Sequence, residues 1–231
     1  MMVGDPKNHD TKFEMENYEE FYAHHNFEPI PEQLCTTVNE VIPRFGWAFD
    51  KVDDLEAKTV LDLGCLDGSF LLSVGKQLGC IVTGVDLTED GISIAKDRAA
   101  KFGVKADFHQ GFVEDWLETF VKEGRKFDVV TFFEIIEHVE DVQKCLTLID
   151  KVLALGGSVL VSTPDFESPL FGADDEVNKC HIRLYTTADE DYERANKFGT
   201  VRKATSITKE IGKDRIQEMN VVNELINVHY K

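Results

Sequence analysis

The sequence predicts an α/β fold built on a doubly wound, mostly parallel sheet, and two features of the chain indicate it. Apolar runs at residues 59–64, 80–87 and 127–133 are nearly continuous, as in strands that are buried on both faces of a sheet. Segments with apolar residues at helical spacing separate these runs. Strands that alternate with helices are joined by right-handed crossovers, which makes their sheet parallel.

The core elements follow one another without a long gap. The fourth strand has the strongest apolar run, and Gly156 and Gly157 are expected to end the last helix of the core. The expected order is strand 59–64, helix 70–78, strand 80–87, helix 92–102, strand 104–111, helix 112–124, strand 127–133, helix 142–153 and strand 158–164.

An N-terminal cap segment, residues 1–57, precedes this core. It has a polar start, an aromatic-rich stretch and a helix that we expect around residues 35–49. Prolines separate its two halves.

The main domain spans residues 58–231 and continues beyond the fifth strand. An irregular, acidic insertion at 165–185 is expected on the substrate side. Two further strands, at 200–212 and 215–228, are expected to form an antiparallel pair at the sheet edge, which brings the sheet to seven strands.

Composition excludes several classes of function. The 231 residues carry a formal net charge of −18, which repels nucleic acid and anionic membrane surfaces. No apolar run approaches the roughly 20 residues that span a bilayer, and no secretion signal is present, so we expect a cytoplasmic protein. Five scattered cysteines without CxxC spacing indicate neither a disulfide framework nor a zinc site. The sequence leaves the oligomeric state open.

The turn after the first strand, in VLDLGCLDGSF, carries the first sign of a ligand. It lacks the G-x-G-x-x-G spacing of a dinucleotide-binding loop, because Leu66 would hinder a pyrophosphate and Asp67 would repel it. The turn lies at the sheet edge where α/β proteins bind ligands. A ligand without phosphates is therefore expected, and the carboxylates of Asp62 and Asp67 suit a cationic or hydroxyl-bearing group.

Asp86 ends the second strand, the place from which an acidic side chain accepts hydrogen bonds from ribose hydroxyls. The alternative is a helix cap, although Thr88 and Asp90 also offer capping oxygens. A nucleoside without phosphates that carries a cationic centre and an amino-acid tail is S-adenosylmethionine.

Four stretches, VLDLGCLDGSF, GVDLTEDGISIAK, FDVVTFFEIIEHVED and GGSVLVSTP, resemble the successive motifs of class I S-adenosylmethionine-dependent methyltransferases. The resemblance covers about residues 58–165 and is strongest to the branch with EHxxD after strand four, which includes quinone-precursor and small-molecule O-methyltransferases. Leu66 departs from the family pattern, which usually has glycine there. The resemblance implies a Rossmann-like methyltransferase fold, S-adenosylmethionine as cofactor, and these cofactor-binding residues: Asp62, Gly64, Gly68, Asp86, Leu87, Phe112, Val113 and Phe133.

The resemblance also implies their roles. Asp62 and Gly64 line the methionine portion, and Gly68 lets the chain pass close to the cofactor. The ribose binds Asp86, and apolar side chains pack on the adenine. The alternatives are a tight structural turn at Asp62 and Gly64, and a purely structural core role for Phe133.

Catalysis needs an acceptor aligned with the methyl group and a base for a protonated acceptor. His138, just past strand four, is the first candidate for this base, and His181 is the second. Glu134 is expected beside the substrate. Each histidine has a scaffold role as its alternative.

A metal is the main alternative at this site. On a helix, Glu134, Glu137 and His138 would share one face and bind Mg²⁺ or Mn²⁺ if His181 joined them, as in the small-RNA 2′-O-methyltransferase family. We expect the metal-free arrangement, because the acidic insertion would repel an RNA end.

The predicted function is in-line methyl transfer to a small-molecule or sugar-type acceptor, with oxygen as the expected target atom. The alternatives are a metal-assisted RNA 2′-O-methyltransferase and a non-catalytic cofactor-binding module. Nothing in the sequence separates O-, N- and C-methylation.

Overall fold

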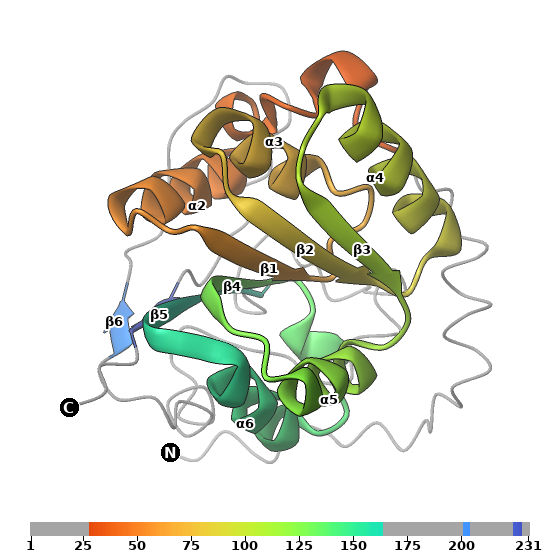
Figure 1. Ribbon diagram of the computed structural model, residues 1–231. Helices are drawn as coiled ribbons and strands as arrows, with labels where there is room; N and C mark the ends of the chain where they lie inside the picture. Colours follow the sequence, from red (N-terminus) through yellow and green to blue (C-terminus); the bar gives the residue numbers. More distant parts are fainter. Residues whose placement is uncertain (1–27, 164–200, 204–223, 228–231) are drawn as a thin grey trace, which may run out of the picture.

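A computed structural model describes residues 28–163 together with the backbone of residues 201–203 and 224–227. Its central feature is a sheet in which five parallel strands take the order β3-β2-β1-β4-β5 (Figure 1). This confirms the predicted parallel α/β core. The strands are β1 (Thr59–Leu63), β2 (Ile81–Asp86), β3 (Ala106–Gln110), β4 (Phe127–Phe133) and β5 (Leu153–Ser162).

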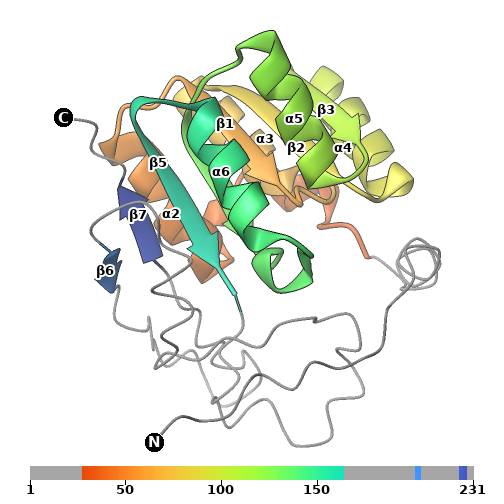
Figure 2. The same ribbon diagram turned by 90° about the horizontal axis from the view of Figure 1, so that it is seen from below.

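Helices cover both faces of the sheet. Figures 1 and 2 show α2, α3 and α4 on one face and α5 and α6 on the other. From β1 the next two strands are added on one side and β4 and β5 on the other, so the strand order reverses between β1 and β4, which is the switch point where ligands bind in such folds. The helices are α2 (Pro43–Asp54), α3 (Ser69–Leu78), α4 (Glu89–Phe102), α5 (Val113–Glu123) and α6 (Val142–Val152), with 3-10 turns η1 (Glu32–Leu34), η2 (Val38–Glu40) and η3 (Ile136–His138).

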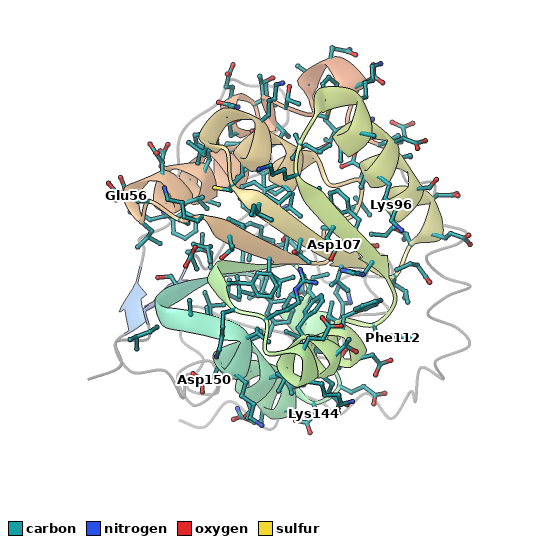
Figure 3. The ribbon with its side chains drawn as sticks, in the orientation of Figure 1. Glu56, Lys96, Asp107, Phe112, Lys144 and Asp150 are labelled. Carbon is teal, nitrogen blue, oxygen red and sulfur yellow. The ribbon has the colours of Figure 1, made fainter. Side chains whose placement is uncertain are left out.

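Alternation along the strands divides the core into two layers. In β1, Val60 packs with the helices of one face and Leu61 with those of the other, because successive strand side chains point to opposite faces. Helices pack on these layers with their apolar stripes, and charged residues such as Lys96 on α4 point outward (Figure 3).

The boundary between α6 and β5 differs from the expectation. The helix ends at Val152, and Gly156 and Gly157 lie inside β5 instead of ending the helix. Lys126 Nζ donates to the carbonyl oxygens of Lys151 at 2.7 Å and Leu153 at 3.1 Å. The carbonyl groups at the helix end thus find a partner on a neighbouring element, which no local sequence pattern specifies.

The helix expected at residues 35–49 begins only at Pro43. Proline lacks an N–H and clashes inside a helix, but it fits the first helical turn. Residues before it form the short turn η2 instead.

Two short backbone segments follow β5. β7 (Glu224–Asn227) pairs antiparallel with β5, and β6 (Val201–Lys203) pairs antiparallel with β7. These residues fall within the two strands expected at the C-terminus, but the complete strand pair stays a prediction, and the insertion at 165–185 lies outside the described residues. Within the described part of the chain, no helix has the length and apolarity to cross a membrane.

Candidate cofactor-binding and active site

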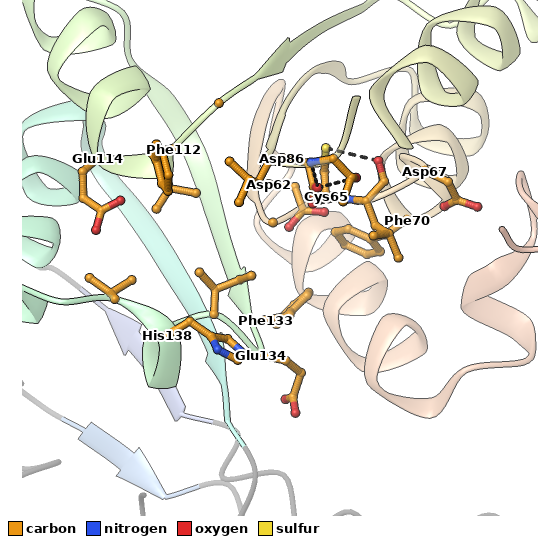
Figure 4. Close-up of a pocket in the computed structure, with 18 of the residues that line it drawn as sticks. Asp62, Cys65, Asp67, Phe70, Asp86, Phe112, Glu114, Phe133, Glu134 and His138 are labelled. Carbon is orange, nitrogen blue, oxygen red and sulfur yellow. Dashed lines mark hydrogen bonds between the residues drawn. The ribbon is translucent and has the colours of Figure 1, made fainter. Parts of the chain in front are cut away.

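A pocket of about 900 Å³ lies at the carboxyl ends of the parallel strands (Figure 4). Its walls come from the loops after β1, β2, β3 and β4 and from the N-terminal segment. Gly68 does not line it, and His181 lies outside the described residues. The structure brings together the other predicted site residues: Asp62, Gly64, Asp86, Leu87, Phe112, Val113, Phe133, Glu134 and His138.

The loop after β1 has a backbone that favours glycine at several positions. Gly64 has a φ of +83°, and a Cβ there would collide with the side chain of Ile135. Leu66 has a φ of +52°, a conformation that costs a leucine energy and that glycine adopts freely. Its amide donates to Asp86 Oδ2 at 2.7 Å, which holds this conformation in place. The leucine side chain remains 39% exposed at the pocket.

Gly68 has a role different from the predicted one. It starts α3 with a φ of +71°, and a Cβ there would come within 2.9 Å of Ala95 and Phe108. The glycine thus allows close packing between the loop, α4 and β3. The structure places it against the core and not on the pocket wall.

Asp67 is not available to a cationic ligand. Its Oδ2 forms an ion pair with Arg98 at 2.7 Å and accepts the Ile30 amide at 2.8 Å. Its Oδ1 accepts the Ser69 amide at 3.1 Å. Figure 4 shows the side chain apart from Asp62 and Asp86. The expectation that Asp67 suits a cationic group on the ligand is therefore wrong, because its charge is already compensated.

Asp62 is buried at the end of β1, where Thr131 Oγ1 donates to its Oδ1 at 2.6 Å. Burial raises the pKa of Asp62 to about 7, and the nearby charge of Asp86 also raises it. A cationic group in the pocket would stabilise the ionised form of this carboxyl.

Asp86 lines the pocket and also hydrogen-bonds to the loops after β1 and β2. Its Oδ1 accepts the amide of Thr88 at 2.8 Å and the Thr88 hydroxyl at 2.6 Å, and its Oδ2 accepts the Leu66 amide. Thr88 is the N-cap residue of α4, so Asp86 does not itself cap this helix but binds the residue that precedes it. A carboxylate offers about four acceptor positions, and these bonds leave one on Oδ2 for a ligand hydroxyl.

The wall between β3 and α5 carries apolar side chains together with the carboxylates of Glu114 and Asp115. Phe112 and Val113 lie at the start of α5 and face the pocket with Leu87. Trp116 Nε1 donates to the Gln110 carbonyl at 3.0 Å, which ties α5 to the end of β3. This wall suits a flat, apolar ring such as a purine.

The opposite wall holds Phe133, Glu134 and His138, which Figure 4 shows near one another. Glu134 has a φ of +55°, and its Oε1 accepts the Ser162 hydroxyl at 2.7 Å. The same oxygen lies 3.0 Å from Arg44 Nη1. A strained backbone next to a pocket is common at functional sites.

Glu137 does not belong to the pocket wall. It is 1% exposed, and its Oε2 accepts the Thr163 hydroxyl at 3.2 Å. Burial, and then the charge of Glu134, raise the pKa of Glu137 to about 8.

The helical arrangement of Glu134, Glu137 and His138 on which the metal alternative depends is therefore not formed. Glu134 precedes the short turn η3 and is not part of a helix. Among the residues that the structure describes, no group of three histidine, cysteine, aspartate or glutamate side chains is placed to hold a metal ion.

Comparison with known proteins places the chain in a family. Residues 54–223 match the family model described as a methyltransferase domain. The chain belongs to this methyltransferase family. It is 35% identical over 130 residues to the ubiquinone biosynthesis O-methyltransferase of Vibrio atlanticus, a match that covers 55% of this chain and 53% of that protein.

A relative with the same name in Haemophilus ducreyi is 40% identical over 119 residues, covering 48% of this chain and 50% of the relative. The chain spans about half the length of the curated relatives it matches.

Solved structures show the same fold at low sequence identity. The plantazolicin methyltransferase BpumL, solved in complex with SAH, matches with a TM-score of 0.62 and 16% identity over 94% of this chain and 92% of that one. The YcgJ protein from Bacillus subtilis matches with a TM-score of 0.53 and 21% identity over 70% and 69%. These similarities confirm a Rossmann-like methyltransferase fold with a parallel sheet.

The N-terminal segment of this methyltransferase domain contributes pocket residues that were not predicted from the sequence. Arg44 and Phe45, in the first turn of α2, line the pocket beside Phe133. The Arg44 guanidinium lies 5.4 Å from the Phe45 ring centroid and 5.9 Å from that of Phe133. Arg44 Nε is buried without a hydrogen-bond partner among the described residues. The one sequence feature that could have indicated this part of the pocket is an arginine, Arg44, directly after the proline that begins a helix.

Proposed function

We propose that the protein is an S-adenosylmethionine-dependent O-methyltransferase that acts on a small hydroxylated acceptor of the quinone-precursor class. One observation carries the proposal: a chain of the methyltransferase family gathers Asp62, Gly64 and Asp86 around a pocket at the switch point of the sheet. The ubiquinone biosynthesis O-methyltransferases among its relatives support oxygen as the target and a quinone precursor as the acceptor. The SAH bound to BpumL supports the cofactor.

The pocket residues fit the parts of this cofactor. The adenine fits the apolar wall of Leu87, Phe112 and Val113. Asp86 has one acceptor position left for a ribose hydroxyl. At the other end of the pocket, the unpartnered donor of Arg44 suits the methionine carboxylate.

The cationic part of the cofactor fits the acidic side of the pocket. Asp62 is buried, and among the described residues the Thr131 hydroxyl donates to its carboxyl. An ionised Asp62 offsets a positive charge on the ligand, which favours the charged cofactor over an uncharged analogue.

When bound, S-adenosylmethionine supplies a methyl group on a positively charged sulfur. An acceptor hydroxyl gains this carbon as the carbon–sulfur bond breaks, and the hydroxyl proton must leave. His138 lies on the wall beside Phe133 and takes this proton as the base. Glu134 positions the acceptor through its carboxylate, and the rings of Phe45 and Phe133 exclude water.

The domain organisation is part of the same proposal. Residues 1–57 form a cap over the pocket, and the insertion at 165–185 contributes the acceptor side. The C-terminal residues complete a seven-stranded sheet through an antiparallel strand pair. A cytoplasmic location remains a prediction from the sequence.

A methyl-transfer assay with isotopically labelled S-adenosylmethionine tests the proposal. The acceptors are catechols with a prenyl tail, simple phenols, sugars and short RNAs. We expect transfer to the catechol oxygen, detected as a methyl ether by mass spectrometry. Transfer only to nitrogen, carbon or RNA, or to none of these acceptors, contradicts the proposed function.

A further inference from the structure

We propose that the buried ion pair between Asp67 and Arg98 is a positioning device that fastens the backbone of residue 30 to the loop after β1 and so completes one wall of the cofactor pocket. The proposal rests on the proposed function, because the wall it completes is the cofactor wall. Its starting point is the burial of Arg98, which is 8% exposed in the middle of α4. It is the one arginine or lysine among the buried residues of the described chain.

A buried charge is costly unless it is paired and hydrogen-bonded. Arg98 Nη1 lies 2.7 Å from Asp67 Oδ2 and 3.4 Å from Ser69 Oγ. Arg98 Nη2 donates to the carbonyl oxygen of Ile30 at 2.7 Å. Asp67 Oδ2 accepts the amide of the same residue at 2.8 Å. The pair therefore satisfies both polar backbone groups of Ile30, which lies in neither a helix nor a strand.

Apolar residues of similar size often replace a buried ion pair without loss of stability. They cannot hydrogen-bond both a backbone amide and a backbone carbonyl. The reason to keep the charges here is thus the attachment of residue 30 rather than the packing of α4.

The sequence around Ile30 is suited to such attachment. Pro29 and Pro31 flank it and have no amide hydrogen, so Ile30 carries the only backbone donor of these three residues. Proline after Ile30 disfavours a helical backbone there, and Pro31 itself is extended with a ψ of 131°. A stiff, extended segment loses little conformational entropy when it docks.

The attachment acts on the pocket from two sides. Ile30 lines the pocket, so its release removes part of the wall. Asp67 lies between Leu66 and Gly68, which both have left-handed backbones, and the Leu66 amide holds Asp86. The ion pair thus fixes the loop after β1, which is hydrogen-bonded to Asp86, the residue expected to bind the ribose.

The decisive variant is the double substitution Asp67→Leu with Arg98→Met in the full chain, because it leaves no unpaired buried charge and no side-chain partner for the backbone of Ile30. We expect the Kd for S-adenosylhomocysteine, measured by calorimetry, to rise about threefold to thirtyfold, the range for residues that act on a site through others. We also expect the Ile30 amide to exchange with solvent faster, measured by hydrogen exchange. The single variant Arg98→Lys keeps the charge but loses the planar fork, and we expect an intermediate rise.

Lys101→Met is the matched control. It removes an ion pair with Glu32 that joins the same segment to the same helix at 2.6 Å, but this pair is exposed on both sides. Such pairs contribute little, so we expect the wild-type Kd and wild-type exchange at Ile30.

Two results overturn the proposal. One is wild-type affinity in the folded double variant or, should that variant not fold, in Arg98→Lys. The other is an Ile30 amide that stays as protected as in the wild type. If the wild-type protein itself does not bind S-adenosylhomocysteine, the proposed function fails, and the exchange measurement still decides whether the ion pair attaches residue 30.

Discussion

Replacing Asp86 with alanine tests the assignment of the ribose site. The variant removes the acceptor position left for a ribose hydroxyl, and a hydrogen bond to a charged group contributes about 1.5–3 kcal/mol. The affinity for S-adenosylhomocysteine should therefore fall roughly tenfold to a hundredfold.

The structure adds a cost that the sequence did not indicate. The Asp86 carboxylate also holds the amides of Leu66 and Thr88 and the Thr88 hydroxyl at 2.6–2.8 Å. Leaving a buried donor without a partner costs about 1–3 kcal/mol, and water can reach the half-exposed loop, so we expect a loss near the lower end of that range. The free energy of unfolding should thus fall measurably while the protein still folds.

Calorimetric titration with S-adenosylhomocysteine gives the affinity, and thermal unfolding gives the stability. Asp90→Ala is the control, because Asp90 is an exposed acid in the first turn of α4 that does not line the pocket. This control should keep wild-type affinity. A folded Asp86→Ala protein that binds as tightly as the wild type would refute the assignment.

Four further predictions concern pH, backbone, burial and metal. Burial raises the pKa of Asp62 to about 7, so the negative charge of this carboxyl grows with pH. The affinity for S-adenosylmethionine, measured by calorimetry, should therefore rise from about pH 6 to about pH 8. Asp62→Asn should remove this rise. Gly64→Ala should lower the melting temperature and the cofactor affinity more than Gly79→Ala, which has a similar φ of +75° but open space around it, so equal losses would contradict the packing argument. Burial raises the pKa of Glu137 from 4.5 to about 8, so folding favours its protonated form, and the free energy of unfolding falls as the pH rises through this interval. The melting temperature of Glu137→Gln relative to the wild type should therefore increase with pH. A difference that stays constant with pH would contradict the burial argument. Turnover should persist in EDTA, while His138→Ala should lower kcat much more than cofactor affinity; activity lost on chelation and restored by Mn²⁺ would instead favour a metal site.

Strands of this protein are predictable because burial on both faces leaves a local signature. β4 occupies Phe127–Phe133, the same residues as its apolar run. The end of α6 was not predictable, because Lys126, in the connection between α5 and β4, provides the partner for its last carbonyl groups. Gly156 and Gly157 resemble a helix stop in the sequence, but they lie in β5 where its register with β4 shifts.

The same distinction applies to the pocket. Asp62, Gly64 and Asp86 were predictable because each lies at a strand end or in the turn that follows, and strand ends meet at one edge of a parallel sheet. The part of the site that comes from Ile30 and Arg44 was not, because these residues reach the pocket only through contacts between distant segments.

The orientation of the Asp67 side chain could not be predicted from the sequence either. Asp67 lies in the turn directly after the strand that carries Asp62, but Arg98, a helix residue 31 positions further along the chain, compensates its charge.

A calorimetric titration of the full chain with S-adenosylmethionine, S-adenosylhomocysteine and NAD tests the assignment of the cofactor pocket most directly. We expect one site per chain for the first two ligands. We expect no binding of NAD, whose pyrophosphate would meet the Leu66 side chain and the carboxylates of Asp62 and Asp86 at the ends of β1 and β2. A folded protein that binds neither S-adenosylmethionine nor S-adenosylhomocysteine, or that binds NAD in their place, would contradict the account.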